Sequence, residues 1–191
     1  VVDGVEVPDD QAYGSRIMGG ILMAGDTEEI SFTANNSDTG SQIESLLLNM
    51  ERDKDYLIVL YGSADEPLML FQELETTRPE PAQVKFLFLH AADSLDAGDL
   101  YMGGTEVENR EVSNLSYSEQ SEYFQVSDYF ARTSVTVSEH DDVFDPEKEL
   151  MNYTYNDLIV SNTNYFSVVG YENGDREDSR LKLWLYDLPT Q

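Results

Sequence analysis

The chain has 191 residues, 40% of them hydrophobic, and its 38 acidic and 11 basic side chains give a net charge of −27. Such a charge argues against nucleic acid and anionic lipid as partners, because both are held by lysine and arginine. Cysteine is absent, which excludes disulfides, thiolate zinc sites and cysteine nucleophiles. No apolar run is long enough to span a bilayer, so we expect no membrane insertion.

The first half of the chain predicts short strands that turns separate. Runs of alternating or continuous apolar residues, bounded by glycine, proline, asparagine and aspartate, are typical of strands. We expect strands at Val1–Val7, Glu29–Thr33, Tyr56–Tyr61 and Leu68–Phe71. Ser41–Met50 predicts at most a short helix. Thr76–Pro81 contains two prolines and no apolar residue, which indicates a linker.

The second half opens on its most apolar segment. A strand is predicted from Val84 to His90, followed by an acidic turn, a second strand around Asp99-Leu100-Tyr101 and a bend at Gly103-Gly104. Further on, Asp145–Tyr153 has aspartate at a cap position and proline at the first helical position. We expect at most one helical turn or a short helix there.

The second half repeats the order of segments in the first. The matched segments are Asp3–Val7 with Gly103–Val107, Ile30–Phe32 with Val135–Val137, Asp55–Val59 with Asn164–Val168, and Leu68–Phe71 with Lys182–Leu185. A shared order over the whole length indicates an internal repeat. Many short strands without alternating helices then predict an all-β fold of two tandem immunoglobulin-like β-sandwiches with little helix. The domains are residues 1–76 and 83–191, and residues 77–82 join them.

The central segment resembles a bacterial family, the domain-of-unknown-function 4397 family. In that family a Val-Arg strand runs into His/Asn-Ala-Ser-Pro-Asp-Ala, then Val-Asp-Val-Tyr and a glycine bend. Here Val84-Lys85, His90-Ala91, Asp93 and Asp99-Leu100-Tyr101 occupy these positions, and the family's proline is absent. The resemblance implies tandem immunoglobulin-like domains exported to the periplasm, the outer surface or the medium of a bacterium. It also implies that the first repeat's opening strand lies upstream of Val1.

Three aspartates in the central segment are candidates for a calcium site. Asp93, Asp96 and Asp99 are spaced by three residues around Gly98, and calcium takes several carboxylate and carbonyl oxygens from a flexible loop. The spacing does not match an EF-hand loop. Glu139–Glu149 and Glu172–Asp178 are equally acidic, and a chain with this many acids forms clusters without a purpose. Calcium is the one cofactor that the sequence leaves open.

The motif residues His90, Asp99, Tyr101 and Gly104 have a structural and a functional interpretation. His90 ends the first predicted strand of the second repeat, where an aspartate beside it would make it a metal ligand or a base. The alternative is that its ring fixes the turn through a hydrogen bond to the backbone. We favour the structural interpretation for all four residues.

No catalytic motif occurs in the sequence, and we expect a non-catalytic binding or display module whose partner is an unknown protein or glycan. His140-Asp141-Asp142 is interpreted as a solvated loop. The alternatives are a carboxylate-dependent glycan hydrolase, since acidic pairs are plentiful, and a purely structural acidic spacer. If the first repeat lacks its opening strand, an open sheet edge would also favour self-association.

Overall fold

The computed structural model describes residues 26–36, 39–62, 66–93, 95–155, 159–171 and 181–190. The predictions for Val1–Val7 and Glu172–Asp178 lie outside these residues. The chain divides into two compact units, Val1–Glu75 and Thr76–Gln191. Within the described residues the fold is all-β with a single α-helix of six residues, so the predicted fold class is confirmed. No helix in this part of the chain is long and apolar enough to cross a membrane.

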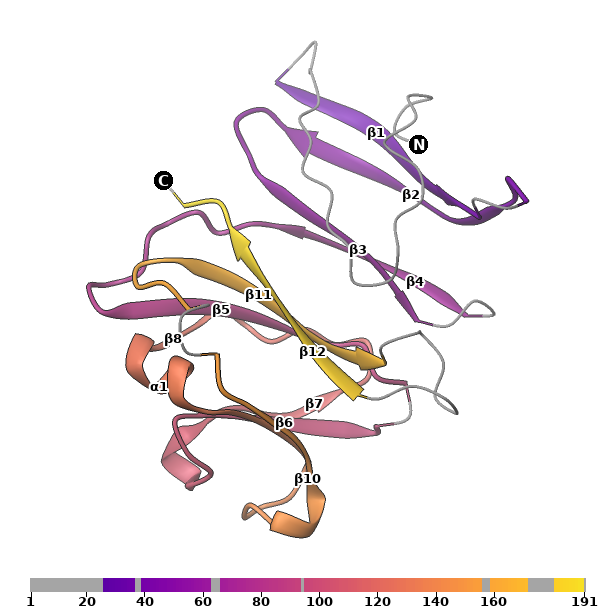
Figure 1. The fold of residues 1–191 in the computed structure, drawn as a ribbon. Helices are drawn as coiled ribbons and strands as arrows, with labels where there is room; N and C mark the ends of the chain where they lie inside the picture. Colours follow the sequence, from indigo (N-terminus) through magenta and orange to yellow (C-terminus); the bar gives the residue numbers. More distant parts are fainter. Residues whose placement is uncertain are drawn as a thin grey trace. The chain divides into compact units, whose positions relative to one another are not determined.

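The first unit contains two antiparallel hairpins. Strand β1 (Thr27–Asn35) pairs with β2 (Gln42–Glu51), and β3 (Tyr56–Gly62) pairs with β4 (Pro67–Glu73), as Figure 1 shows in indigo and purple. Strands were expected at the places of β1, β3 and β4, and these expectations are confirmed.

The helix considered for Ser41–Met50 is wrong, because this segment forms β2. Leu48 is buried opposite Ile30 of β1, whereas its neighbours Leu47 and Asn49 are exposed. Burial therefore alternates with the period of a strand, and pairing with β1 decides the local structure.

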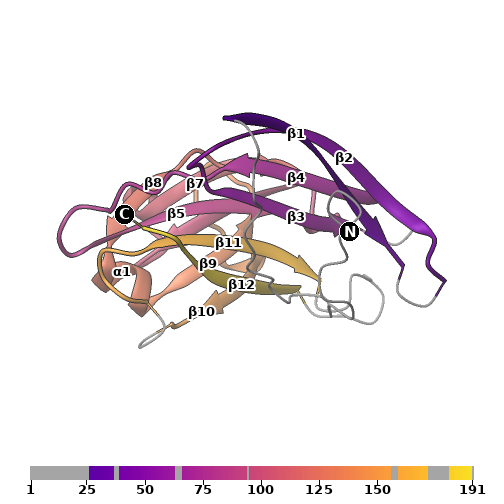
Figure 2. The same cartoon turned by 90° about the horizontal axis from the view of Figure 1, so that it is seen from above.

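The second unit is a sandwich of two four-stranded sheets. One sheet has the order β10-β9-β6-β7 and the other β12-β11-β5-β8, with every pair antiparallel except β5 and β11. In Figure 1 the two sheets form separate layers, and α1 lies at one end of the strands in both views (Figure 1, Figure 2). The elements are β5 (Gln83–His90), β6 (Ala97–Met102), β7 (Arg110–Ser116), β8 (Phe124–Ser127), α1 (Asp128–Thr133), β9 (Val135–Glu139), β10 (Glu149–Tyr153), β11 (Asn164–Tyr171) and β12 (Leu181–Leu188).

The hydrophobic core of this unit lies between its two sheets. Apolar side chains from both sheets form one buried cluster, in which Phe86 of β5 stacks on Tyr165 of β11 with ring centroids 5.5 Å apart. Other members are Val84, Phe88, Leu100, Met102, Val135, Val137 and Val169. Their burial is the main favourable contribution to the stability of such a sandwich.

The order of strands within the sandwich has its own pattern. The first strand of the unit, β5, pairs with β11 and β8, and the second strand, β6, belongs to the opposite sheet. In immunoglobulin constant domains the first two strands share a sheet. The unit is therefore a β-sandwich whose first two strands, unlike those of an immunoglobulin constant domain, lie in opposite sheets. Within its own sheet β6 lies between β7 and β9.

The helical turn considered for Asp145–Tyr153 is present in part. Residues 146–148 form one 3₁₀ turn, and the Asp145 side chain accepts a hydrogen bond from the Glu147 amide at 2.9 Å. Glu149–Tyr153 is the strand β10, not a helix, because it pairs with β9. The short helix α1 was not predicted; six residues leave no helical period to detect.

A tyrosine at the start of a strand makes the same contact in each unit. The Tyr56 hydroxyl accepts a hydrogen bond from the Glu51 amide at 2.9 Å, and the Tyr165 hydroxyl accepts one from the Val160 amide at 2.7 Å. Both contacts span five residues, and the two tyrosines were matched in sequence. Similar tyrosine corners occur in immunoglobulin-like sandwiches. The tandem repeat stays a prediction, which this pair of contacts supports.

Candidate functional site

A buried polar cluster of the second unit is built around Asp99. This residue lies on β6, between β7 and β9, and its side chain is fully buried at 0% exposure. The pairing of β6 with β7 shifts register between Gly98 and Leu100, so Ser113 and Asn114 both lie opposite Asp99. Such a β-bulge leaves a backbone group free of the ladder. Here the Asn114 amide, on a residue with a φ of 54°, donates to Asp99 Oδ1 at 2.8 Å.

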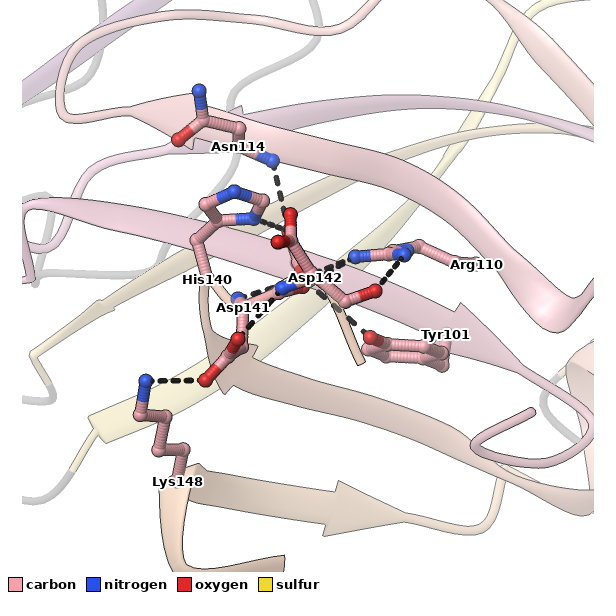
Figure 3. Close-up of polar contacts among 8 residues, drawn as sticks. Tyr101, Arg110, Asn114, His140, Asp141, Asp142 and Lys148 are labelled. Carbon is pink, nitrogen blue, oxygen red and sulfur yellow. Dashed lines mark hydrogen bonds and ion pairs between the residues drawn. The ribbon is translucent and has the colours of Figure 1, made fainter. Parts of the chain in front are cut away.

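Two basic side chains complete the surroundings of this carboxylate. His140 Nδ1 lies 2.8 Å from Asp99 Oδ1, and Arg110 Nη1 donates to Oδ2 at 3.1 Å (Figure 3). Burial by itself would raise the pKa of Asp99. The hydrogen bonds from the Asn114 amide, His140 and Arg110 outweigh that effect and hold the pKa below its ordinary value. Asp99 is therefore a buried, ionised carboxylate.

Arg110 joins this carboxylate to the chain that follows β9. Its Nη1 donates to the Asp141 carbonyl at 2.6 Å and its Nη2 to the Asp142 carbonyl at 2.8 Å. The Asp141 side chain in turn accepts from Lys148 Nζ at 2.7 Å, as Figure 3 shows. The cluster thus ties β6, the start of β7 and residues 140–148 together. These hydrogen bonds and ion pairs hold the loop over residues 140–148 in place.

The bond to Asp99 shows which ring nitrogen of His140 carries a proton. An ionised carboxylate only accepts hydrogen bonds, so Nδ1 donates to Asp99 Oδ1. In Figure 3 the other ring nitrogen, Nε2, lies on the far side of the ring from this contact. The side chain is 31% exposed.

A pocket of about 350 Å³ lies beside this histidine. Leu95, Asp96, Ala97, Glu139 and His140 line it. The His140 amide donates to the Ala97 carbonyl at 3.0 Å, which joins the two segments that line the pocket. The pocket therefore combines two apolar side chains with two carboxylates and an imidazole.

His90 lies at the end of β5 and is fully buried. Its Nδ1 accepts a hydrogen bond from the Ala92 amide at 3.3 Å, which is the kind of turn contact that the structural interpretation expects. Nε2 has no hydrogen-bond partner among the described residues. Burial is the main reason that the pKa of His90 is lowered from its ordinary value.

The structure does not bring the three calcium candidates together. Asp99 is buried and bonded to Arg110 and His140, whereas Asp93 and Asp96 are exposed. Within the described part of the chain, no three side chains of histidine, cysteine, aspartate or glutamate converge as a metal site. Calcium binding stays a prediction, and the hydrogen bonds of Asp99 to Arg110 and His140 argue against this set of ligands.

Tyr101 and the glycine bend complete the motif. The buried Tyr101 hydroxyl lies 3.5 Å from Asp99 Oδ2, and its ring packs edge-on against Phe144. Gly103 has a φ of 88°, and a Cβ there would lie 2.7 Å from Phe130 Cβ. At Gly104 a Cβ would collide with the carboxylate of Glu106. At both glycines a neighbouring side chain therefore lies where a Cβ atom would be.

No family model matches the chain, and no curated protein shows significant similarity to it. The resemblance of Val84–Gly104 to the exported bacterial family therefore rests on its motif residues alone and stays a prediction.

Sequence reasoning missed the partners of Asp99. His140 had been interpreted as part of a solvated loop, and Arg110 and Asn114 had not been singled out. They lie 41, 11 and 15 residues from Asp99 along the chain, so only the sheet brings them together. One signal was present: basic residues are scarce in this chain, and Arg110 lies shortly after the motif.

Proposed function

We propose that the protein is a non-catalytic binding module, a β-sandwich scaffold that presents acidic loops to a basic protein partner. The arrangement of Asp99 carries the proposal. Its Oδ1 accepts from the Asn114 amide and His140, and its Oδ2 from Arg110. A carboxylate so occupied has no free oxygen for a substrate or a metal ion, and the cluster serves to hold residues 140–148.

The charge of the second unit supports a basic partner. Residues 76–191 contain 22 acidic and 8 basic side chains. Several of the basic groups are already paired, among them Arg110 with Asp99 and Lys148 with Asp141. The remaining carboxylates produce a negative potential that attracts and orients a cationic partner before contact.

Repeat organisation and location belong to the same proposal. The matched contacts of Tyr56 and Tyr165 support two copies of one domain in tandem. The resemblance to an exported bacterial family supports a place in the periplasm, on the outer surface or in the medium. Fractionation of the native source with an antibody to this chain tests the location, and recovery in the cytoplasm alone would contradict it.

A peptide-binding assay tests the function. The purified chain is presented by interferometry with a lysine- and arginine-rich peptide, with a glutamate-rich peptide of equal length, and with neutral glycans. We expect binding to the basic peptide alone, weakening at least about tenfold when ionic strength rises from about 0.01 M to about 0.15 M, as the Debye length falls from about 30 Å to about 8 Å. Release of reducing sugar from a glycan would establish a hydrolase instead. Absence of binding to every ligand would indicate a structural spacer.

A further inference from the structure

We propose that Lys85 and Asn164 form an intramolecular isopeptide bond, an amide between the side-chain nitrogen of the lysine and the side-chain carbonyl carbon of the asparagine. The bond is a covalent modification that the chain makes on itself, and it joins β5 to β11. The evidence comes from two buried side chains that the Asp99 cluster does not use, so the inference is independent of the proposed function.

Both side chains are of types that are rarely buried. Lys85 is 4% exposed and Asn164 is 0% exposed. Among the described residues, Lys85 is the only buried lysine or arginine and Asn164 is the only buried asparagine. Lysine is almost never fully buried unless its amine is paired. The burial of these two residues therefore calls for a reason beyond the hydrophobic core.

The sheet places the two side chains next to each other. Strands β5 and β11 run parallel, and Lys85 and Asn164 are partners in their register. Neighbouring strands lie about 4.8 Å apart, and paired residues project from the same face of the sheet. That face is opposite the core between the sheets, because the adjacent Phe86 and Tyr165 stack within the core. The long lysine side chain can therefore reach the amide of its short partner.

One carbonyl oxygen brings the two nitrogen atoms together. Lys85 Nζ donates to the Thr77 carbonyl at 3.1 Å, and Asn164 Nδ2 donates to the same oxygen at 3.3 Å. The segment over residues 77–82, predicted as a linker, is itself held, since Asn162 Nδ2 donates to two of its carbonyls at 3.4 Å each. Thr77 is therefore a positioning residue for both reacting groups.

The reaction balances within the chain. A bond forms between Lys85 Nζ and Asn164 Cγ, and the bond between Cγ and Nδ2 of the asparagine breaks. Starting from the ammonium form, Nζ keeps one proton and passes two to Nδ2, which leaves as ammonium, so no oxidant, reductant or second substrate takes part. Attack of an amine on an amide is slow in water, but well-oriented intramolecular groups reach effective concentrations of about 10⁵–10⁸ M. Burial also keeps water away from the same carbonyl carbon.

The cross-link suits the composition of this chain. Cysteine is absent, so no disulfide can restrict the unfolded state. An isopeptide bond between β5 and β11 closes a loop over residues 85–164, and closing a long loop restricts the unfolded state in the same way as a disulfide. Unlike a disulfide, it does not depend on the redox state of the surroundings.

Mass spectrometry of the purified full chain tests the bond. Loss of one ammonia lowers the intact mass by about 17 Da, and trypsin does not cleave after an acylated lysine. After several days in the folded state, we expect this lower mass and a branched tryptic peptide that contains both Lys85 and Asn164. An intact mass equal to that of the unmodified sequence would overturn the proposal. A loss of ammonia located at any other asparagine would overturn it as well.

Two variants separate the reaction from a purely structural contact. Lys85→Arg keeps a cation and hydrogen-bond donors, but its guanidinium stays protonated and is no nucleophile, so we expect the full mass. Lys182→Arg is the control, because this lysine lies on β12 of the same sheet opposite Gly170, and it should lose ammonia as the unaltered chain does. Loss of ammonia from Lys85→Arg, or a full mass for Lys182→Arg, would contradict the bond. If Lys85→Arg does not fold, the branched peptide of the unaltered chain decides alone.

Discussion

Asp99 shows how one residue can carry two different interpretations in sequence and in structure. As a member of a spaced aspartate triplet it indicates calcium, but in the sheet it is the buried counter-charge of Arg110 and a hydrogen-bond partner of His140. Breaking a buried pair leaves an uncompensated charge and costs more than the pair itself contributes. The stability of the loop over residues 140–148 therefore depends on this carboxylate.

Replacing Asp99 by asparagine tests that dependence. Asp99→Asn keeps the shape but leaves the 12%-exposed Arg110 side chain without its counter-charge, so we expect the free energy of unfolding to fall by about 3 kcal/mol. The exposed Asp142→Asn is the matched control and should change it by less than about 0.5 kcal/mol. Urea denaturation measures both. Equal effects would show that Asp99 is not the centre of the cluster.

His90 predicts a pH dependence of stability. Its pKa in the folded chain is lowered, first by burial, below an unfolded value of about 6.5. Above about pH 6.5 the ring is neutral in both states and no stability is lost. Below that pH the unfolded state takes up a proton more readily, so stability decreases until the folded pKa is reached. We expect the difference in unfolding free energy between the unaltered chain and His90→Gln to shrink from pH 7 towards acid, and a constant difference would contradict this.

At the scale of elements, alternation of apolar residues predicted the strands and pairing decided the exceptions. Glu29–Thr33 and Tyr56–Tyr61 were recognised because their own residues alternate or are continuously apolar. The segment of β2 was misassigned as a possible helix, because it is a strand through its pairing with β1, which its own residues do not reveal. The bulge at Asn114 was not predictable for the same reason: it exists only relative to β6. The candidate site depends on that bulge, so the sequence indicated Asp99 and not its environment.

The glycine bend after β6 offers a test at this scale. Gly103→Ala places a Cβ 2.7 Å from Phe130 Cβ at a φ of 88°, whereas Gly40→Ala has a φ of 68° with open space around it. Both variants place alanine in a left-handed backbone conformation, which costs free energy, and only Gly103→Ala adds a steric clash. We expect Gly103→Ala to destabilise its unit by about 1–2 kcal/mol more than Gly40→Ala destabilises the other. Thermal unfolding measures both, and equal losses would mean that Phe130 moves aside freely.

For the whole molecule, the dominant property is a net charge of −27. Self-repulsion of this size destabilises a compact state and is screened by salt. The fold class followed from the sequence because it depends on many short strands at once, and no single misassigned segment alters it. The partner did not follow, since charge alone does not distinguish a basic protein from dissolved cations.

A melting experiment with calcium distinguishes screening from a site. Because Asp99 is already occupied, we expect Ca²⁺ to raise the melting temperature no more than Mg²⁺ at equal concentration, through screening alone. A ligand with a real site on the folded state adds stability that keeps growing with the logarithm of its concentration above the dissociation constant. A specific effect of Ca²⁺ that Asp96→Asn abolishes would restore the predicted calcium site.

The tyrosine contacts at Tyr56 and Tyr165 restrict where the chain can tolerate insertions. Each hydroxyl reaches an amide five residues upstream, so residues 51–56 and 160–165 form closed loops of equal length. One added residue in either loop would open the hydrogen bond and, if the strand slid to restore it, would turn the side chains of β3 or β11 to the opposite face. These two loops are therefore unsuitable places to graft a foreign sequence.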